Sequence, residues 1–302
     1  MSQARPVRTF STELNTRRCS ERRFFLNPCA VVSEIVLYVF AVIANRYGIA
    51  VHALCVMSSH YHLVMTDVRG KLPKFFQDAH SLIARSLNAF HGRSENFFAG
   101  GKQPSRVELL DEEAQLEKLI YLYTNPVAAG LVKRWEEWPG VITKPCFRGA
   151  YTIRVKRPRF FFRAKRWPAE ITLRITPPPA LAHLDPKELG DRLFDGIKKR
   201  EKEIREQFRR EGRKFLGRKG VLHQKHTKQA ASEEALFAMN PRVACKDVSR
   251  RAQWLKERKE WLDQHRQAFV ALRDKAEVVV PFPEGSWKWV EFGGGTVETA
   301  PG

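Results

Sequence analysis

A chain of 302 residues can form one large or two ordinary domains, and a hydrophobic content of 43% argues against disorder throughout. The 53 Lys and Arg side chains exceed the 33 Asp and Glu side chains by 20, and the pI is about 10. Such a charge indicates a polyanionic partner, either nucleic acid or an anionic membrane surface. Residues 1–150 hold 19 basic and 13 acidic side chains, so only 6 of the 20 excess charges lie there.

Cysteine usage and hydropathy indicate the cellular setting. The five cysteines are an odd number, lie far apart and include no CxxC pair, which predicts a reducing compartment and no cysteine zinc site. The long apolar run at 35–44 is shorter than the ~20 residues that a membrane-spanning helix needs. No signal peptide or membrane anchor is visible in the sequence, so we expect a cytoplasmic protein without a membrane partner.

Strand and helix patterns alternate along the first half of the chain. In chain order we expect a strand at 9–18, a helix at 31–47, strands at 49–57 and 60–66 about a turn, a helix at 72–91, a strand at 106–110 and a helix at 111–123. This order predicts an α+β domain over residues 1–148, with a ferredoxin-like antiparallel sheet and helices packed on it.

Residues 149–302 are expected to form a second region, a basic and mainly helical C-terminal extension that binds DNA or positions a substrate. Residues 171–176 alternate as a half-buried strand does, and the segment DPKE at 185–188 has the N-cap and first-turn residues of a long helix. A second long helix is expected at 248–274, paired antiparallel with the first, and a loop at 217–240.

The stretch 156–163 interleaves cations with three phenylalanines. Rings can stack on bases while cations follow phosphates, which suits single-stranded nucleic acid. The alternative is a solvated edge strand. Together with a basic cluster behind the first strand, this stretch gives the candidate DNA contacts Arg17, Arg18, Arg22, Arg23, Lys156, Arg157, Arg159 and Arg163.

His60 and His62 carry the strongest chemical signal in the chain. Side chains of a strand repeat every second residue, so the two imidazoles point to the same face. Such a pair alone is weak evidence for a metal site, because strand histidines are more often satisfied or exposed. About sixty residues later the chain reads YLYTNPVAAGLV at 121–132.

These motifs resemble the single-tyrosine HUH transposases, and specifically the REP-associated tyrosine transposases, over residues 9–145. The resemblance implies that one divalent ion, Mg²⁺ or Mn²⁺, is held on the scissile phosphate by the histidine pair. It also implies attack by a tyrosine on single-stranded hairpin DNA, which leaves a 5′-phosphotyrosine and a free 3′-hydroxyl. By this match His60 and His62 are metal ligands, Asn125 is a further ligand and Tyr121 is the nucleophile.

Several alternatives remain open from the sequence. Tyr123 is a rival nucleophile, and Asn125 with Pro126 also suits the N-cap and first position of a short new helix. The whole chain can be an inactivated relative that only binds hairpins. A zinc hydrolase is a more remote alternative, since a third strong ligand is not evident. The sequence does not distinguish a monomer from a homodimer.

Overall fold

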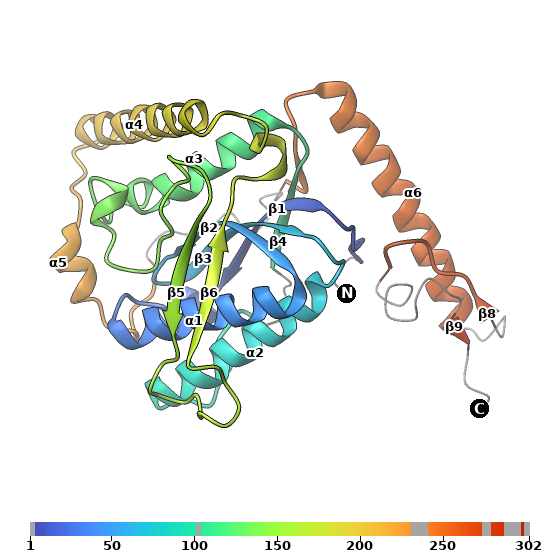
Figure 1. Ribbon diagram of the computed structural model, residues 1–302, viewed down its shortest axis with the longest axis horizontal. Helices are drawn as coiled ribbons and strands as arrows, with labels where there is room; N and C mark the ends of the chain where they lie inside the picture. Colours follow the sequence, from blue (N-terminus) through green and yellow to red (C-terminus); the bar gives the residue numbers. More distant parts are fainter. Residues whose placement is uncertain (1–3, 101–103, 231–240, 274–278, 287–296, 299–302) are drawn as a thin grey trace.

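A mixed seven-stranded sheet with helices on both faces organises the chain (Figure 1). The computed structural model describes residues 4–100, 104–230, 241–273, 279–286 and 297–298. The strand order is β5-β6-β2-β3-β1-β4-β7, and β8 and β9 form a separate pair.

The central strands have the ferredoxin-like arrangement that the sequence predicts. The first elements are β1 (Ser11–Arg18), η1 (Ser20–Arg22), α1 (Ala30–Tyr47), β2 (Ile49–Val56), β3 (His60–Asp67), α2 (Leu72–His91), β4 (Ser105–Leu109), α3 (Glu112–Ala128) and η2 (Trp135–Glu137). The order β4-β1-β3-β2 has every neighbouring pair antiparallel. The predicted antiparallel sheet with packed helices is confirmed.

The later elements extend this sheet and cover one of its faces. They are β5 (Tyr151–Lys156), β6 (Glu170–Ile175), η3 (Pro179–Leu181), α4 (Pro186–Arg210), α5 (Gly217–Leu222), β7 (Val243–Ala244), α6 (Val248–Arg273), β8 (Val279–Val280) and β9 (Val297–Glu298). β6 pairs parallel with β2 through Ile175 and Val51, and β7 pairs parallel with β4. The region after residue 148 therefore shares a sheet with the first, and the division into two domains there stays a prediction.

The two sheet faces bury separate hydrophobic clusters. On β3, Tyr61, Leu63 and Met65 pack with α1 and α2, whereas Val64 packs with α3 and α4. Because strand side chains alternate between faces, His62 lies on the α3 side. Helix α3 and the histidine pair therefore meet on the face opposite α1 and α2.

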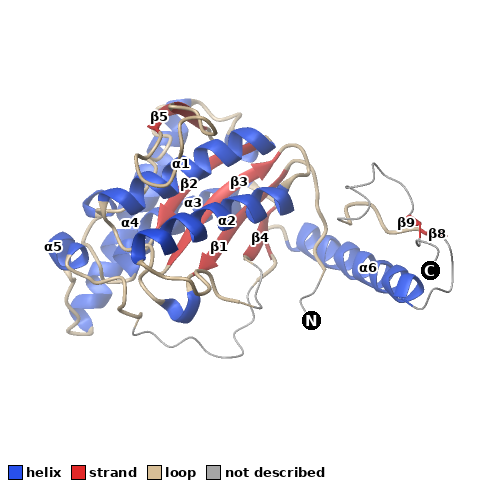
Figure 2. Cartoon of the chain, turned by 90° about the horizontal axis from the view of Figure 1, so that it is seen from below, coloured by secondary structure: helices blue, strands red, loops and turns tan. Residues whose placement is uncertain are grey.

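Helix α4 lies along α3 and not along α6 (Figure 1). Its predicted apolar stripe is buried, at Leu189, Leu193, Ile197, Ile204 and Phe208. Gly196 permits the close approach of α4 to α3, since an added Cβ would lie 2.3 Å from Ile120 Cδ1, and Gly190 does the same for the segment before β5, where an added Cβ would lie 2.2 Å from the Phe147 carbonyl oxygen. Figure 2 shows α6 apart from the helices that cover the sheet. The predicted pairing of the two long helices is wrong, because the apolar stripe of α4 packs on the outer face of α3.

The loop predicted at 217–240 is also wrong in its first part. Residues Gly217–Leu222 form α5, and Val221 is fully buried in the α3 and α4 cluster. The helix is short, and the residues around Val221 are mostly polar. The sequence therefore shows no helical periodicity at 217–222. Residues 231–240 of the predicted loop lie outside the described residues.

Helix α1 is, among the described helices, the one long and apolar enough to cross a membrane by length and composition. It extends for 18 residues, beyond the apolar run on which the sequence prediction rests. Ten of its side chains are buried in the cluster formed with the sheet and α2. Its place in this core accounts for its hydropathy.

A buried histidine on β2 couples stability to pH. His52 Nδ1 donates to the Thr176 carbonyl at 2.9 Å, and its Nε2 lies 2.8 Å from the Thr66 hydroxyl. Burial lowers the pKa of His52 to about 4. Between pH 4 and about 6.5, His52 is therefore protonated in the unfolded chain but neutral in the folded chain.

We expect the His52→Gln variant to lose less stability than the wild type when the pH falls from 7 to 4. The neutral-histidine contribution is present above pH 6.5 and is lost as the pH falls towards 4, a change on the order of 3 kcal/mol. Urea unfolding of both proteins at the two pH values measures it. Equal losses in both proteins would contradict the assignment of the acid sensitivity to His52.

Candidate active site

Strand β3 presents His60 and His62 with their Nε2 atoms facing each other. The two Nε2 atoms lie 3.1 Å apart, and the rings are perpendicular with centroids 4.8 Å apart. Two nitrogens about 2.1 Å from one ion at a right angle lie about 3.0 Å apart. The spacing of the pair therefore fits two ligands of one divalent ion.

The other nitrogen of each imidazole has a hydroxyl partner. Thr16 Oγ1 lies 2.8 Å from His62 Nδ1, and Ser59 Oγ lies 3.1 Å from His60 Nδ1. Thr16 is directly opposite His62 in the β1–β3 register. Partners of this kind orient an imidazole and leave Nε2 for a ligand.

Helix α3 places Tyr121 against the histidine pair. The Tyr121 ring meets the His62 ring edge-on, with centroids 5.4 Å apart at 82°. Its side chain is 44% exposed, so an incoming strand can reach it. Lys118, one turn earlier, has its ammonium 5.9 Å from the Tyr121 ring centroid.

Asn125 lies within α3 and contacts both His62 and Tyr121. The alternative that Asn125 caps a new helix is wrong, because α3 continues through Pro126 to Ala128. The ring of Pro126 costs one main-chain hydrogen bond but is buried in the packed helix. Tyr121 and Asn125 are therefore one turn apart on the same helical face.

Burial and nearby arginines set the charge of these groups. Burial, and then the charges of Arg18 and Arg22, lower the pKa of His60 to about 4. Burial likewise holds the pKa of His62 well below 6.5, against a hydrogen bond accepted by Asn125 that raises it. Both imidazoles are therefore neutral at pH 7, which is the form that binds metals.

The phenol of Tyr121 is held protonated in this site. Burial raises its pKa, while hydrogen bonding to Asn125 and the charge of Arg18 lower it. A protonated phenol is a weak nucleophile. Asn125 and Arg18 are the neighbours that favour its ionised form.

Tyr123, the rival nucleophile, is placed in the core. It is 1% exposed, and its hydroxyl donates to the Lys144 carbonyl at 3.2 Å. Its ring packs against Trp135 with centroids 5.7 Å apart. The structure thus brings Tyr121, and not Tyr123, to the histidine pair.

The basic cluster behind the first strand divides between the site and the scaffold. Arg18 and Arg22 influence His60 electrostatically and lie at the site. Arg17 is on the other sheet face, where Nη2 donates to the Ala99 carbonyl at 3.0 Å. Arg23 bonds Glu21 at 3.0 Å and a distant carbonyl, that of Thr227, at 2.9 Å.

The second basic stretch borders a groove of about 830 Å³ between α1, the segment 140–143 and β5. Lys156, Arg157 and Arg159 line it, with Phe160 at its end, and Arg163 lies beyond it in the exposed loop after β5. Arg157 also donates to the Trp167 carbonyl at 2.6 Å. β5 is the outermost strand of the sheet and ends at Lys156, so the edge-strand alternative holds for Lys156 alone, and residues 157–163 belong to the loop that follows.

Within the described residues no group of three or more His, Cys, Asp or Glu side chains is arranged to hold a metal. Asn125 stays the predicted further ligand of the pair, and the zinc hydrolase stays an alternative. The sequence reading missed Thr16 and the bonding role of Ser59. Thr16 is connected to His62 only through the β1–β3 register, which cannot be read from the sequence.

Comparison with known proteins gives structural matches alone. No protein-family model and no curated protein matches this chain. Solved structures do match this chain. A REP-associated tyrosine transposase bound to a REP hairpin matches with 17% identity and a TM-score of 0.38, over 46% of this chain and 81% of that one. A candidate transposase from Deinococcus radiodurans matches with 18% identity and a TM-score of 0.29, over 40% of this chain and 95% of that one.

Proposed function

We propose that this protein is a metal-dependent tyrosine transposase that cuts and rejoins single-stranded hairpin DNA. The observation that carries the proposal is the meeting of the exposed Tyr121 with the paired Nε2 atoms of His60 and His62, 3.1 Å apart. Asn125 contacts both the tyrosine and His62. A nucleophile beside a two-imidazole site is the arrangement that phosphoryl transfer to tyrosine needs.

The chain's own residues supply positioning and charge. His60, His62 and Asn125 would hold Mg²⁺ or Mn²⁺, which neutralises charge on the scissile phosphate when bound. Tyr121 Oη forms the new bond to phosphorus as the bond from phosphorus to the 3′ oxygen breaks. The phenol proton is released to solvent, and the 3′ oxygen leaves as a hydroxyl after taking a proton from water. Reversal by another 3′-hydroxyl joins new strands.

We infer that bound DNA also contacts the basic groove between α1, the segment 140–143 and β5. Lys156 and Arg159 are exposed on its rim, and Phe160 offers a ring face for a base. Arg18 carries positive charge near Tyr121, and both Arg18 and Arg22 carry it near His60. The proposed enzyme is cytoplasmic, in line with five free cysteines.

Replacing Tyr121 with Phe should abolish cleavage and the covalent protein–DNA adduct but leave hairpin binding intact. Only the attacking hydroxyl is removed, and the ring contact with His62 remains. Denaturing gels of a labelled imperfect hairpin with Mn²⁺ detect both products. Tyr123→Phe is the matched control, because it removes a hydroxyl from the core, and it should still cut.

Cutting by the Tyr121→Phe variant would overturn the nucleophile assignment. Tight hairpin binding by the wild type without cleavage, in Mn²⁺ and across pH 5 to 9, would instead identify an inactivated relative that acts only as a DNA-binding protein.

Replacing Thr16 with Val should weaken Mn²⁺ binding by about 10- to 100-fold, because His62 loses the hydroxyl that orients its ring. Titration calorimetry with Mn²⁺ measures the change. Thr12→Val is the control, since Thr12 lies on the same strand and pairs its hydroxyl with Thr66 at 2.8 Å, away from His60 and His62. Equal Mn²⁺ affinity in all three proteins would count against a metal at the pair.

Removing Lys156 and Arg159 together, as a double Ala variant, should weaken hairpin binding and flatten its salt dependence. Each lost phosphate contact lowers the slope of log affinity against log salt by about 0.7 for a single strand. The control is the Lys199→Ala, Arg209→Ala variant, which removes the same charges from the exposed face of α4. An unchanged slope in the first variant would exclude the groove as a DNA contact.

A further inference from the structure

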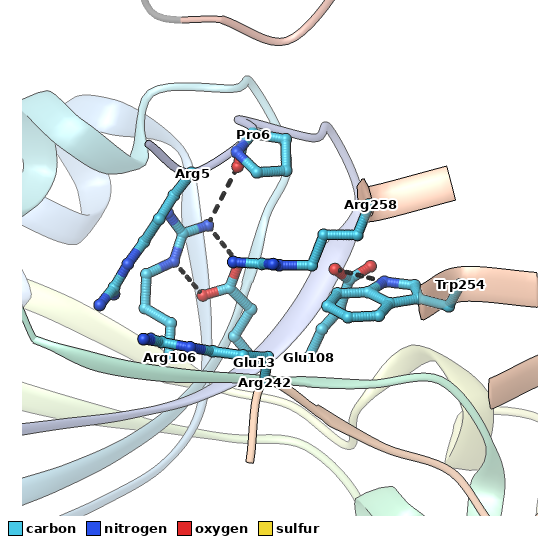
Figure 3. Close-up of a pocket in the computed structure, with 8 residues that line it drawn as sticks. All are labelled: Arg5, Pro6, Glu13, Arg106, Glu108, Arg242, Trp254 and Arg258. Carbon is cyan, nitrogen blue, oxygen red and sulfur yellow. Dashed lines mark hydrogen bonds and ion pairs between the residues drawn. The ribbon is translucent and has the colours of Figure 1, made fainter. Parts of the chain in front are cut away.

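A second charged pocket lies where the N-terminal segment, β1, β4 and α6 meet (Figure 3). It is lined by Arg5, Pro6, Glu13, Arg106, Glu108, Arg242, Trp254 and Arg258. Glu13 pairs with Glu108 across β1 and β4, and with Met65 of β3, which packs on the α1 and α2 side. The pocket is therefore on the opposite sheet face from the histidine pair.

Both carboxylates of the pocket are already engaged. Arg106 donates two hydrogen bonds to Glu13, from Nε to Oε2 at 2.7 Å and from Nη2 to Oε1 at 2.5 Å. Glu108 accepts a hydrogen bond from Trp254 Nε1 at 3.0 Å and lies 3.7 Å from Arg8 Nη1. Figure 3 shows these two carboxylates held apart from Arg5.

Among the described side chains, positive charge is in excess in this pocket. Four arginines and two glutamates line it, and Arg106 pairs with Glu13 while Arg8, outside the lining, pairs with Glu108. Arg5 donates to the Pro104 carbonyl, which carries no charge. Its pKa is lowered to about 10, first by burial and then by the charges of Arg106 and Arg242. The Asp67 carboxylate is not part of the pocket lining and accepts hydrogen bonds from the backbone N–H groups of residues 69, 71 and 72.

Anchoring of α6 does not by itself explain this excess. The Trp254–Glu108 hydrogen bond fastens the helix, and the guanidinium carbons of Arg8 and Arg258 lie 5.8 and 5.9 Å from the Trp254 ring centroid. A half-buried group of like charges is costly unless an anion compensates it. The enclosed room, about 30 Å³, holds one or two water-sized groups, and the rest of the pocket is open.

We propose that this pocket binds a phosphate group, with one or two oxygens inserted between Arg5 and Arg242 and the remainder facing solvent. Guanidinium groups recognise phosphate oxygens through paired N–H donors, which ammonium groups do not. A phosphodiester of bound DNA fits this description, and that source rests on the proposed function. Free inorganic phosphate has the same chemistry and is the other source.

The test compares the Arg5→Ala, Arg242→Ala variant with the Arg251→Ala, Arg266→Ala variant, which removes two exposed arginines from α6. The first arm measures the melting temperature in sodium phosphate against sodium chloride at equal ionic strength. The second arm measures hairpin affinity at several salt concentrations. Both arms use equilibrium measurements on the full chain and need no cleavage.

Loss of phosphate-specific stabilisation in the pocket variant, with the control unchanged, supports the site. If hairpin affinity also falls and the salt slope drops by about 0.7 to 0.9, the phosphate comes from DNA. If only the first arm responds, the ligand is free phosphate. A wild type without hairpin affinity contradicts the proposed function yet leaves the first arm decisive.

Identical behaviour of the two variants in both arms would overturn the proposal and leave the arginines as an anchor for α6. The single variants Arg5→Gln and Arg242→Gln keep most of each side chain's packing. They provide the same comparison if the double variant does not fold, and an unaltered phosphate response in both overturns the proposal equally.

Discussion

The pairing of β1 with β3 is the constraint on which the rest of the site depends. Its register sets Thr16 against His62 and Arg18 against His60, so one strand supplies both the orienting hydroxyl and the positive charge. A slip of one residue would turn the whole β1 set to the other sheet face. Burial of Leu14 on one face and the Glu13–Arg106 pair on the other makes such a slip costly.

The tyrosine side of the site depends on packing contributed from far along the chain. Helix α3 has the sheet on one side and α4 on the other, and the two helices share a buried cluster. Glu201 of α4 is fully buried and accepts the Trp135 N–H at 2.8 Å, which fixes the chain just after α3. Residues long after the tyrosine motif thus hold the helix that presents it.

Periodicity and turn residues in the sequence were enough to predict the central fold. Helices α1 and α2 end one residue before Gly48 and Gly92, and both glycines have positive φ, which is why their ends were readable. The partner of α4 was not readable, because an apolar stripe shows that a face is buried but not against what. The continuation of α3 through Pro126 was missed for a related reason. Local preference disfavours it, and only tertiary burial reverses that preference.

The side-chain amide of Asn125 changes the pKa values of His62 and Tyr121 in opposite directions. It raises the pKa of His62, as an accepting oxygen does, and lowers that of Tyr121, as a donating N–H does. A carboxylate in its place would attract a cation more strongly but would have no hydrogen to give, and its charge would oppose formation of a phenolate. An amide is the side chain of this length that combines both capacities, so Asn125 links the protonation of His62 to that of Tyr121.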